Sequence, residues 1–228
     1  MTKSTYLDLK QKIRSLGYAT IVVEGNIGVG KTSLARLLVT RLGGRLVEER
    51  VDDNPFLERF YDDMRTYGLQ TQLVFLVNRY KQQLALGQGD LFADLVVVDY
   101  LYARDRIFAH VTLSDDELAL YEKIASLLAV KPTGQTLVVY LQASSEILYE
   151  RIQQRGVSFE RPISRHYLET LNEAFNHYFF NYSEGPLLVV NTDGMDFVND
   201  ERHFLDLVQR LGEPVRNTEF YVPSWGTR

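Results

Sequence analysis

A glycine-rich stretch near the N-terminus, VVEGNIGVGKTS, has the spacing of a loop that binds phosphate groups. Four of its residues fit the pattern G-x-x-x-x-G-K-[ST], with an apolar run before it and a helical pattern after it. Glycines let backbone N–H groups curl around phosphate oxygens, while the lysine neutralises the β- and γ-phosphates and the threonine hydroxyl can bind Mg²⁺. The sequence therefore predicts a nucleotide-phosphate site. Its expected residues are Gly25, Asn26, Ile27, Gly28, Val29, Gly30, Lys31, Thr32 and Ser33.

A second chemical signal is the aliphatic run LVVVD, which ends on the carboxylate of Asp99. In a P-loop protein, a strand of this kind presents its acidic residue to the phosphate loop, where it holds Mg²⁺ directly or through water. Asp99 could instead cap the helix that follows, and the two roles can coexist. We expect Thr32 and Asp99 to form the metal site. A P-loop alone does not determine the reaction, because GTPases, motors and small-molecule kinases all use one.

The elements that must position these residues are short β-branched runs alternating with helical patterns. The runs are ATIVVEG, GRLVEE, DLVVVD, QTLVVYLQ and PLLVVNTD. They lack in–out alternation, as expected of strands buried on both faces of a parallel sheet. The order predicts a P-loop, three-layer α/β sandwich with five parallel strands and a helical lid. We expect a polar helix over residues 1–17, this domain over 18–212 and a tail over 213–228.

Composition limits the partners that the protein can have. The 228 residues carry a formal charge of −5, which argues against a general nucleic-acid binder. The absence of cysteine excludes disulfides and thiolate chemistry. No apolar run approaches the roughly 18 residues needed to cross a membrane. We therefore expect a cytoplasmic protein that binds a small molecule, and neither nucleic acid nor membrane.

From about Tyr18 to about Leu211 the chain resembles the deoxynucleoside kinases, in particular the bacterial branch that acts on deoxyadenosine, deoxyguanosine or deoxycytidine. The segments that carry the resemblance are the phosphate loop, EERVDDNPF, FYDDMRTYGLQTQLVFLVNRYKQQ, the strand that ends at Asp99, and SSEILYERIQQRGVSFERPISRHYLETL. The resemblance implies transfer of the γ-phosphate of ATP, with Mg²⁺, to the 5′-hydroxyl of a deoxynucleoside. It slightly favours a purine deoxynucleoside, and it implies a homodimer.

The resemblance also assigns roles to single residues. It places the general base on Glu49, with the adjacent Glu48 as the competitor that faces the other side of the strand. It implies that a tyrosine and a glutamate bind the sugar 3′-hydroxyl. It also implies that a glutamine, an arginine and an aspartate bind the nucleobase. A side-chain amide suits base reading because it offers a donor and an acceptor together. The implied substrate-binding residues are Tyr61, Gln72, Arg79, Asp105 and Glu160.

A lid and an adenine loop complete the implied site. Arg151 and Arg155 are four residues apart, so they share a helix face and could stabilise charge on the transferred group. With Lys31 and Glu49 they form the expected catalytic set. After the fifth strand, Asp196 and Phe197 are expected to contact the ATP adenine.

One position departs from the family. Relatives usually carry an arginine where this chain has Tyr100, and tyrosine retains a hydrogen-bond donor without the fixed charge. Our hypothesis is that Arg50, Arg104 or Arg106 supplies that charge. The alternative functions are a thymidylate-type nucleoside monophosphate kinase and a non-catalytic, kinase-like assembly protein such as the accessory subunit of respiratory complex I. Tyr100 favours the non-catalytic alternative, and the intact phosphate loop opposes it.

Overall fold

A computed structural model describes residues 3–87, 95–128 and 135–223. Within these ranges, six parallel strands form one sheet in the order β2-β3-β1-β4-β5-β6. The chain passes from β1 to β2 and β3 on one side and to β4 on the other, so the topological switch point lies at the carboxyl end of β1. The strands are β1 (Thr20–Gly25), β2 (Arg45–Val47), β3 (Val96–Val98), β4 (Thr136–Gln142), β5 (Leu187–Asn191) and β6 (Thr218–Tyr221).

The predicted fold class is confirmed, but the predicted number of strands was wrong. The extra strand, β6, lies in the segment from Glu213 that was expected to be a tail. It pairs with β5 alone and forms an edge of the sheet, with Phe220 largely exposed. An edge strand of four residues does not need the continuous apolar run that marks a strand buried on both faces. The sequence pattern therefore did not reveal it.

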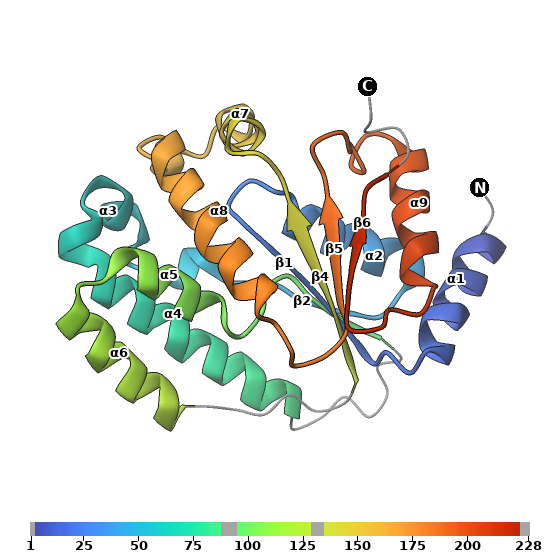
Figure 1. Ribbon diagram of the computed structural model, residues 1–228, viewed down its shortest axis with the longest axis horizontal. Helices are drawn as coiled ribbons and strands as arrows, with labels where there is room; N and C mark the ends of the chain where they lie inside the picture. The colour runs from blue at the N-terminus through green and yellow to red at the C-terminus, as the bar shows by residue number, and fades with distance from the viewer. Residues whose placement is uncertain (1–2, 88–94, 129–134, 224–228) are drawn as a thin grey trace.

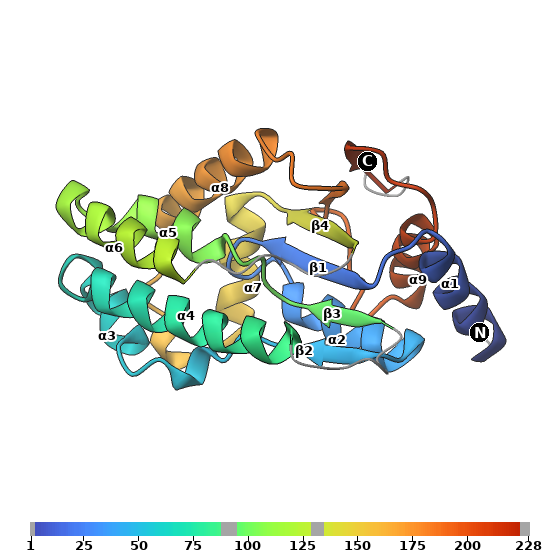
Figure 2. The ribbon, with the colours of Figure 1, turned by 90° about the horizontal axis from the view of Figure 1, so that it is seen from below.

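Helices cover both sides of the sheet. Figures 1 and 2 show α1, α2 and α9 on one side, α4, α5, α6 and α8 on the other, and α7 above the carboxyl ends of the strands. No helix in the described ranges is both long and apolar enough to cross a membrane. The helices are α1 (Lys3–Ser15), α2 (Lys31–Leu42), α3 (Leu57–Asp62), α4 (Met64–Gly87), α5 (Arg104–Thr112), α6 (Asp115–Leu127), α7 (Ser145–Arg155), α8 (Arg165–Phe180) and α9 (Glu201–Leu211), with 3₁₀ turns at Val51–Asp53 and Ser158–Glu160.

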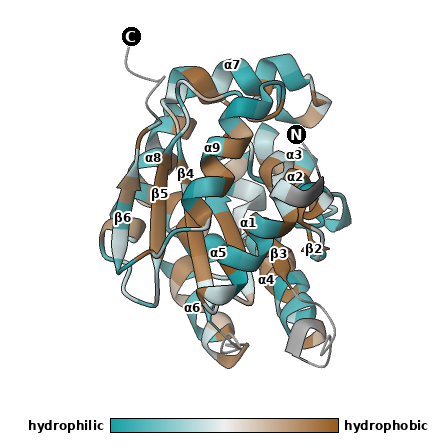
Figure 3. Ribbon diagram, turned by 90° about the vertical axis from the view of Figure 1, so that its right-hand side faces the viewer, coloured by the Kyte–Doolittle hydropathy of each residue, from teal (hydrophilic) through white to brown (hydrophobic). Residues whose placement is uncertain are grey.

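The hydrophobic strands lie between helices whose outer faces are polar (Figure 3). The N-terminal helix, expected to be polar, buries one side of itself. Tyr6, Leu9 and Ile13 recur at spacings of three and four and are buried where α1 packs on α2 and α9. The Tyr6 hydroxyl also donates a 3.0 Å hydrogen bond to Glu201 of α9. Helix α1 is thus tied to the body of the domain.

The turn between α2 and β2 depends on a glycine. Gly44 has a φ of +120°, and a Cβ there would overlap the carbonyl oxygen of Leu95. The backbone of Arg45 donates a 2.9 Å hydrogen bond to the same oxygen, which aligns β2 with the sheet. This glycine therefore determines where β2, and the residues that follow it, enter the site.

We predict that Gly44→Ala lowers the free energy of unfolding by about 3 kcal/mol or more, since it adds both backbone strain and a steric overlap. Gly156→Ala is the matched control. Its φ of +68° is also positive, but no described heavy atom lies within 4 Å of an added Cβ, so we expect a loss of about 1 kcal/mol. For a chain of this size, thermal unfolding should fall by roughly 6–12 °C in the first variant and 2–4 °C in the second. Equal shifts would contradict this account of the turn.

Candidate active site

A cavity of about 820 Å³ opens at the carboxyl ends of the strands, at the switch point of the sheet. Its walls come from the phosphate loop, the segment after β2, helices α3, α4 and α5, and the turn after α7. The volume lies within the range of pockets that enclose small-molecule ligands. Of the expected phosphate-loop residues, Ile27, Gly28, Lys31 and Thr32 line it.

The phosphate end of the cavity brings the expected metal-binding pair together. The Thr32 hydroxyl donates a 2.6 Å hydrogen bond to the Asp99 carboxylate, which also accepts a 2.7 Å bond from the Glu49 backbone N–H. A hydroxyl and a carboxylate side by side are the oxygen donors that Mg²⁺ prefers. Asp99 does not cap α5, whose N-cap is Ala103. The capping alternative was therefore wrong.

Lys31 starts α2 directly after Gly30, which has a left-handed φ of 103°. Its ammonium donates a 2.9 Å hydrogen bond to the carbonyl oxygen of Asn26, across the loop. The pKa of Lys31 is lowered to about 7, first by burial and then by the nearby Arg104, while the neighbouring carboxylates oppose the shift. The loop is thus closed around a lysine that loses its proton near neutral pH.

Glu49 and Glu48 point to different environments. The Glu49 carboxylate is mostly buried and pairs with Arg79 on one oxygen and, at 3.5 Å, with Arg104 on the other. Burial alone would raise the pKa of the Glu49 carboxyl, but these two guanidinium groups and Lys31 outweigh it, so the net shift is downward. Glu48 instead pairs with the exposed Arg36. The structure places Glu49, and not Glu48, at the centre of the charged cluster.

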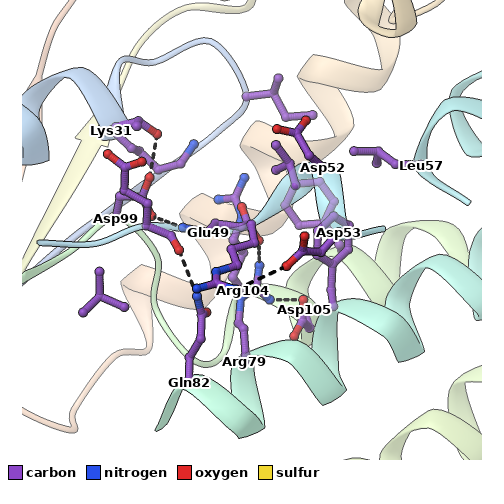
Figure 4. A pocket seen from close by; sticks show the side chains of 18 of the residues that line it. Lys31, Glu49, Asp52, Asp53, Leu57, Arg79, Gln82, Asp99, Arg104 and Asp105 are labelled. Carbon is purple, nitrogen blue, oxygen red and sulfur yellow. Dashed lines mark hydrogen bonds and ion pairs between the residues drawn. The ribbon is translucent and has the colours of Figure 1, made fainter. Parts of the chain in front are cut away.

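The other end of the cavity holds the three residues that the resemblance assigned to the nucleobase, and all three are buried. Gln72, Arg79 and Asp105 are each 2% exposed and line the cavity. The Arg79 guanidinium pairs with both Asp105 and Glu49 (Figure 4). The Gln72 amide lies 3.5 Å from the Thr112 hydroxyl. The Asp105 Oδ2 atom is buried with no hydrogen-bond partner among the described residues, so it can accept a bond from a ligand.

The lid residues are engaged with the protein itself. Arg155 makes a bidentate ion pair with Glu160, with bonds of 2.7 Å to each carboxylate oxygen. The ring of Phe159 stacks on Tyr61, with centroids 6.2 Å apart and 8° between planes. Arg155, Glu160 and Tyr61 therefore meet at one wall of the cavity.

Other expected residues lie outside the cavity lining. Arg151 bonds to the carbonyl oxygens of Val29, Thr192 and Met195, so it links α7 to the phosphate loop and to the loop after β5. The Asp196 carboxylate accepts bonds from the backbone and side chain of Asn199. Phe197 is buried, and a Cβ on Gly30 would come within 2.9 Å of its ring. The expected site residues that do not line the cavity are Gly25, Asn26, Val29, Gly30, Ser33, Arg151, Asp196 and Phe197.

Sequence reasoning missed one buried pair. Glu24, the residue before the end of β1, has no exposed surface. Its carboxylate pairs with Arg104 and accepts backbone hydrogen bonds from Gly25 (2.7 Å) and Leu101 (2.6 Å). A charged residue inside the apolar run before the phosphate loop was the available signal. Sequence reasoning also missed Gln82, to which it assigned no role. Gln82 lines the cavity, accepts a 2.8 Å bond from Tyr100 and donates a 2.9 Å bond to the Glu48 carbonyl.

Comparisons with known proteins show the family of this chain. The family model for deoxynucleoside kinases matches residues 21–216. Deoxyguanosine kinase from Bacillus subtilis (strain 168) is 35% identical over 204 residues, which span 85% of this chain and 96% of the relative. Deoxyadenosine/deoxycytidine kinase from the same organism is 28% identical over 206 residues, which span 87% and 94%.

Solved structures share the fold. The structure of deoxyadenosine kinase from M. mycoides with bound dATP has a TM-score of 0.75 to this chain at 23% identity, and covers 86% of this chain and 100% of its own. The predicted resemblance and the predicted class of enzyme are confirmed. The chain belongs to the deoxynucleoside kinase family and is a kinase that phosphorylates deoxynucleosides.

Proposed function

We propose that this protein transfers the γ-phosphate of ATP to the 5′-hydroxyl of a purine deoxynucleoside. The observation that carries the proposal is the position of Glu49, a buried carboxylate in one cavity with a phosphate loop on one side and buried polar groups on the other. Relatives named as deoxyguanosine and deoxyadenosine kinases support a purine substrate. A relative's structure with bound dATP supports a nucleotide ligand. A homodimer and a cytoplasmic location stay predictions.

Glu49 acts in this proposal as the general base. Its carboxylate accepts the proton of the 5′-hydroxyl while that oxygen bonds to the γ-phosphorus, and the bond between the γ-phosphorus and the bridging oxygen breaks to release ADP. Lys31 holds the phosphates, and Arg155 would stabilise their charge after parting from Glu160. Bound Mg²⁺, held by Thr32 and Asp99, would neutralise phosphate charge. Arg151 stabilises the phosphate loop through its hydrogen bond to the Val29 carbonyl oxygen.

The buried polar groups suit a purine edge. The free Oδ2 of Asp105 accepts hydrogen bonds, as the N–H groups of guanine or the amino group of adenine require. Gln72 offers a donor and an acceptor beside it. Tyr61 and Glu160 would bind the 3′-hydroxyl, which suits an unphosphorylated sugar. Asp196 and Phe197 stay the proposed contacts of the ATP adenine.

The proposal is tested with purified protein, Mg–ATP and the four deoxynucleosides, with the four monophosphates in parallel. We expect one 5′-monophosphate and one ADP per turnover, with deoxyguanosine or deoxyadenosine turned over faster than the pyrimidines. Turnover of a monophosphate alone would replace the proposal with a thymidylate-type kinase. Binding of ATP without any turnover would replace it with a non-catalytic protein.

Replacement of the proposed base should separate it from its neighbour. We predict that Glu49→Gln lowers kcat by about 10²- to 10⁴-fold, since an amide cannot accept the hydroxyl proton. Glu48→Gln, the matched control one residue away, should change kcat by less than about threefold because its side chain faces Arg36. Steady-state kinetics with the best deoxynucleoside measures both. The reverse ranking would assign the base to Glu48.

Nucleotide binding should take up a proton at Lys31. With a pKa of about 7 in the free protein, this amine is mostly neutral at pH 8, while phosphate contact favours its charged form. Calorimetry of Mg–ATP binding in buffers of different ionisation enthalpy should show an uptake of about 0.9 proton at pH 8 and about 0.1 at pH 6. Affinity should therefore weaken as pH rises above about 7.

The control for this effect is Lys31→Met, which removes the titrating amine and leaves every other group in place. The difference in proton uptake between pH 8 and pH 6 should disappear in this variant. An uptake in the unaltered protein that is equal at both pH values would show that Lys31 is already charged before the nucleotide binds.

A further inference from the structure

Tyr100 does not place a charge in the site. Its side chain is 1% exposed, its hydroxyl donates to Gln82, and its ring lies 5.1 Å from the Arg79 guanidinium carbon. Burial raises the pKa of the Tyr100 hydroxyl well above its usual value, so it stays neutral. Tyr100 therefore contacts Gln82 through its hydroxyl and Arg79 through its ring, and adds no positive charge to the site.

Of the three arginines named as sources of the charge, Arg50 and Arg104 line the cavity, and only Arg104 is buried there. Arg50 is 73% exposed and lies 3.7 Å from Asp53, and Arg106 is 60% exposed and lies 2.6 Å from Glu122. Arg104 is only 7% exposed and lines the cavity. It begins α5, so the first turn of that helix points its side chain at the end of β1.

Arg104 is held on both sides. Its Nη1 atom pairs with the Glu24 carboxylate and donates a 2.9 Å bond to the Gly25 carbonyl. Its guanidinium carbon lies 4.8 Å from the Phe108 ring centroid, a cation–π contact. Its Nε atom faces Glu49 Oε2 at 3.5 Å. Arg104 thus contacts both the start of the phosphate loop and the proposed base, Glu49, near which it lies in Figure 4.

We infer that Arg104 supplies the positive charge that Tyr100 lacks, and that it is the positioning residue for Glu49. Arg79 holds Oε1 of the carboxylate, and Arg104 faces Oε2 at the longer distance, which leaves Oε2 as the oxygen that accepts the hydroxyl proton. The pair of cations keeps Glu49 ionised and fixes the plane of its carboxylate. This inference rests on the proposed function, because it assigns Arg104 a part in that reaction.

Several groups share the surroundings of Glu49, and the test must separate Arg104 from them. Arg79 is the other strong partner, and it stays in place in the variants below. The titratable and charged groups that face Glu49 from other elements are Lys31 of α2, Tyr61 of α3, Arg79 of α4, Asp99 and Tyr100 after β3, and Arg104 of α5.

The single variant Arg104→Gln would leave the buried Glu24 carboxylate without its cation and could fail to fold. The comparison is therefore between Glu24→Gln alone and the double variant E24Q/R104Q, in which both members of the pair are neutral. Both retain Arg79, and they differ only at Arg104. Arg106→Gln, two residues further along at an exposed ion pair, controls for the loss of an arginine from α5.

We expect the acidic limb of the kcat/KM profile to lie about 1–3 pH units higher in E24Q/R104Q than in E24Q, since loss of a nearby cation raises the pKa of the base. The kcat on the plateau should fall by about 10- to 100-fold because the carboxylate is no longer oriented. E24Q/R104K should restore the limb, and Arg106→Gln should leave it unchanged. A purely structural role would lower the active fraction and leave the limb in place.

A second readout does not need turnover. The ¹³C resonance of the Glu49 carboxyl carbon, assigned by its loss in Glu49→Gln, should titrate at a higher pH in the double variant than in E24Q. Equal titration midpoints and equal limbs would overturn the inference. If the unaltered protein phosphorylates no deoxynucleoside, the proposed function fails, and the carboxyl titration still decides whether Arg104 acts on Glu49.

Discussion

The ionised carboxylate of Glu49, held between two buried guanidinium groups, is the constraint on which the rest of the site depends. Removal of a carboxylate from water costs several kcal/mol, which neighbouring cations must offset. Arg79 and Arg104 provide those cations from two different helices, and each has a second carboxylate partner, Asp105 or Glu24. The low pKa of the Glu49 carboxyl therefore depends on the packing of β1, α4 and α5 against one another.

The same network joins the two ends of the cavity. At one end, Asp99 accepts hydrogen bonds from Thr32 and from the Glu49 backbone, so the proposed metal-binding pair is bonded directly to the proposed base. At the other end, Arg79 is bonded to both Glu49 and Asp105. A ligand that binds Asp105 is therefore linked to Glu49 through one residue, Arg79. Under the proposed function, this arrangement gives a physical route by which binding of the nucleobase would align the Glu49 carboxylate.

Local patterns predicted much of the fold and part of the site. Five strands follow from unbroken β-branched runs, and the Thr32–Asp99 contact follows from motif spacing and a parallel sheet, whose strand ends meet at one edge. The exposed edge strand β6 carries no such pattern, which is why the strand count was too low.

Contacts between distant segments could not be predicted in the same way. The pairing of Arg104 with Glu24 spans 80 residues. From the sequence, three arginines could compensate for Tyr100, and only the packing of α5 distinguishes Arg104 from the other two. Arg155 was expected to bind the transferred phosphate and Glu160 the 3′-hydroxyl, but the two side chains pair with each other. The spacing of residues in the sequence does not predict this pairing. Side-chain direction in the folded state decides such cases.

The most direct test of the central claim is a crystal structure of the protein with ADP and deoxyguanosine, or deoxyadenosine if that is the better substrate. We expect the phosphates on the loop around Lys31, the nucleobase edge on Asp105 and Gln72, and the 5′-oxygen within roughly 2.6–3.2 Å of a Glu49 carboxylate oxygen. A nucleoside bound elsewhere, or one whose 5′-oxygen faces Glu48 with Glu49 still closed between its arginines, would contradict it.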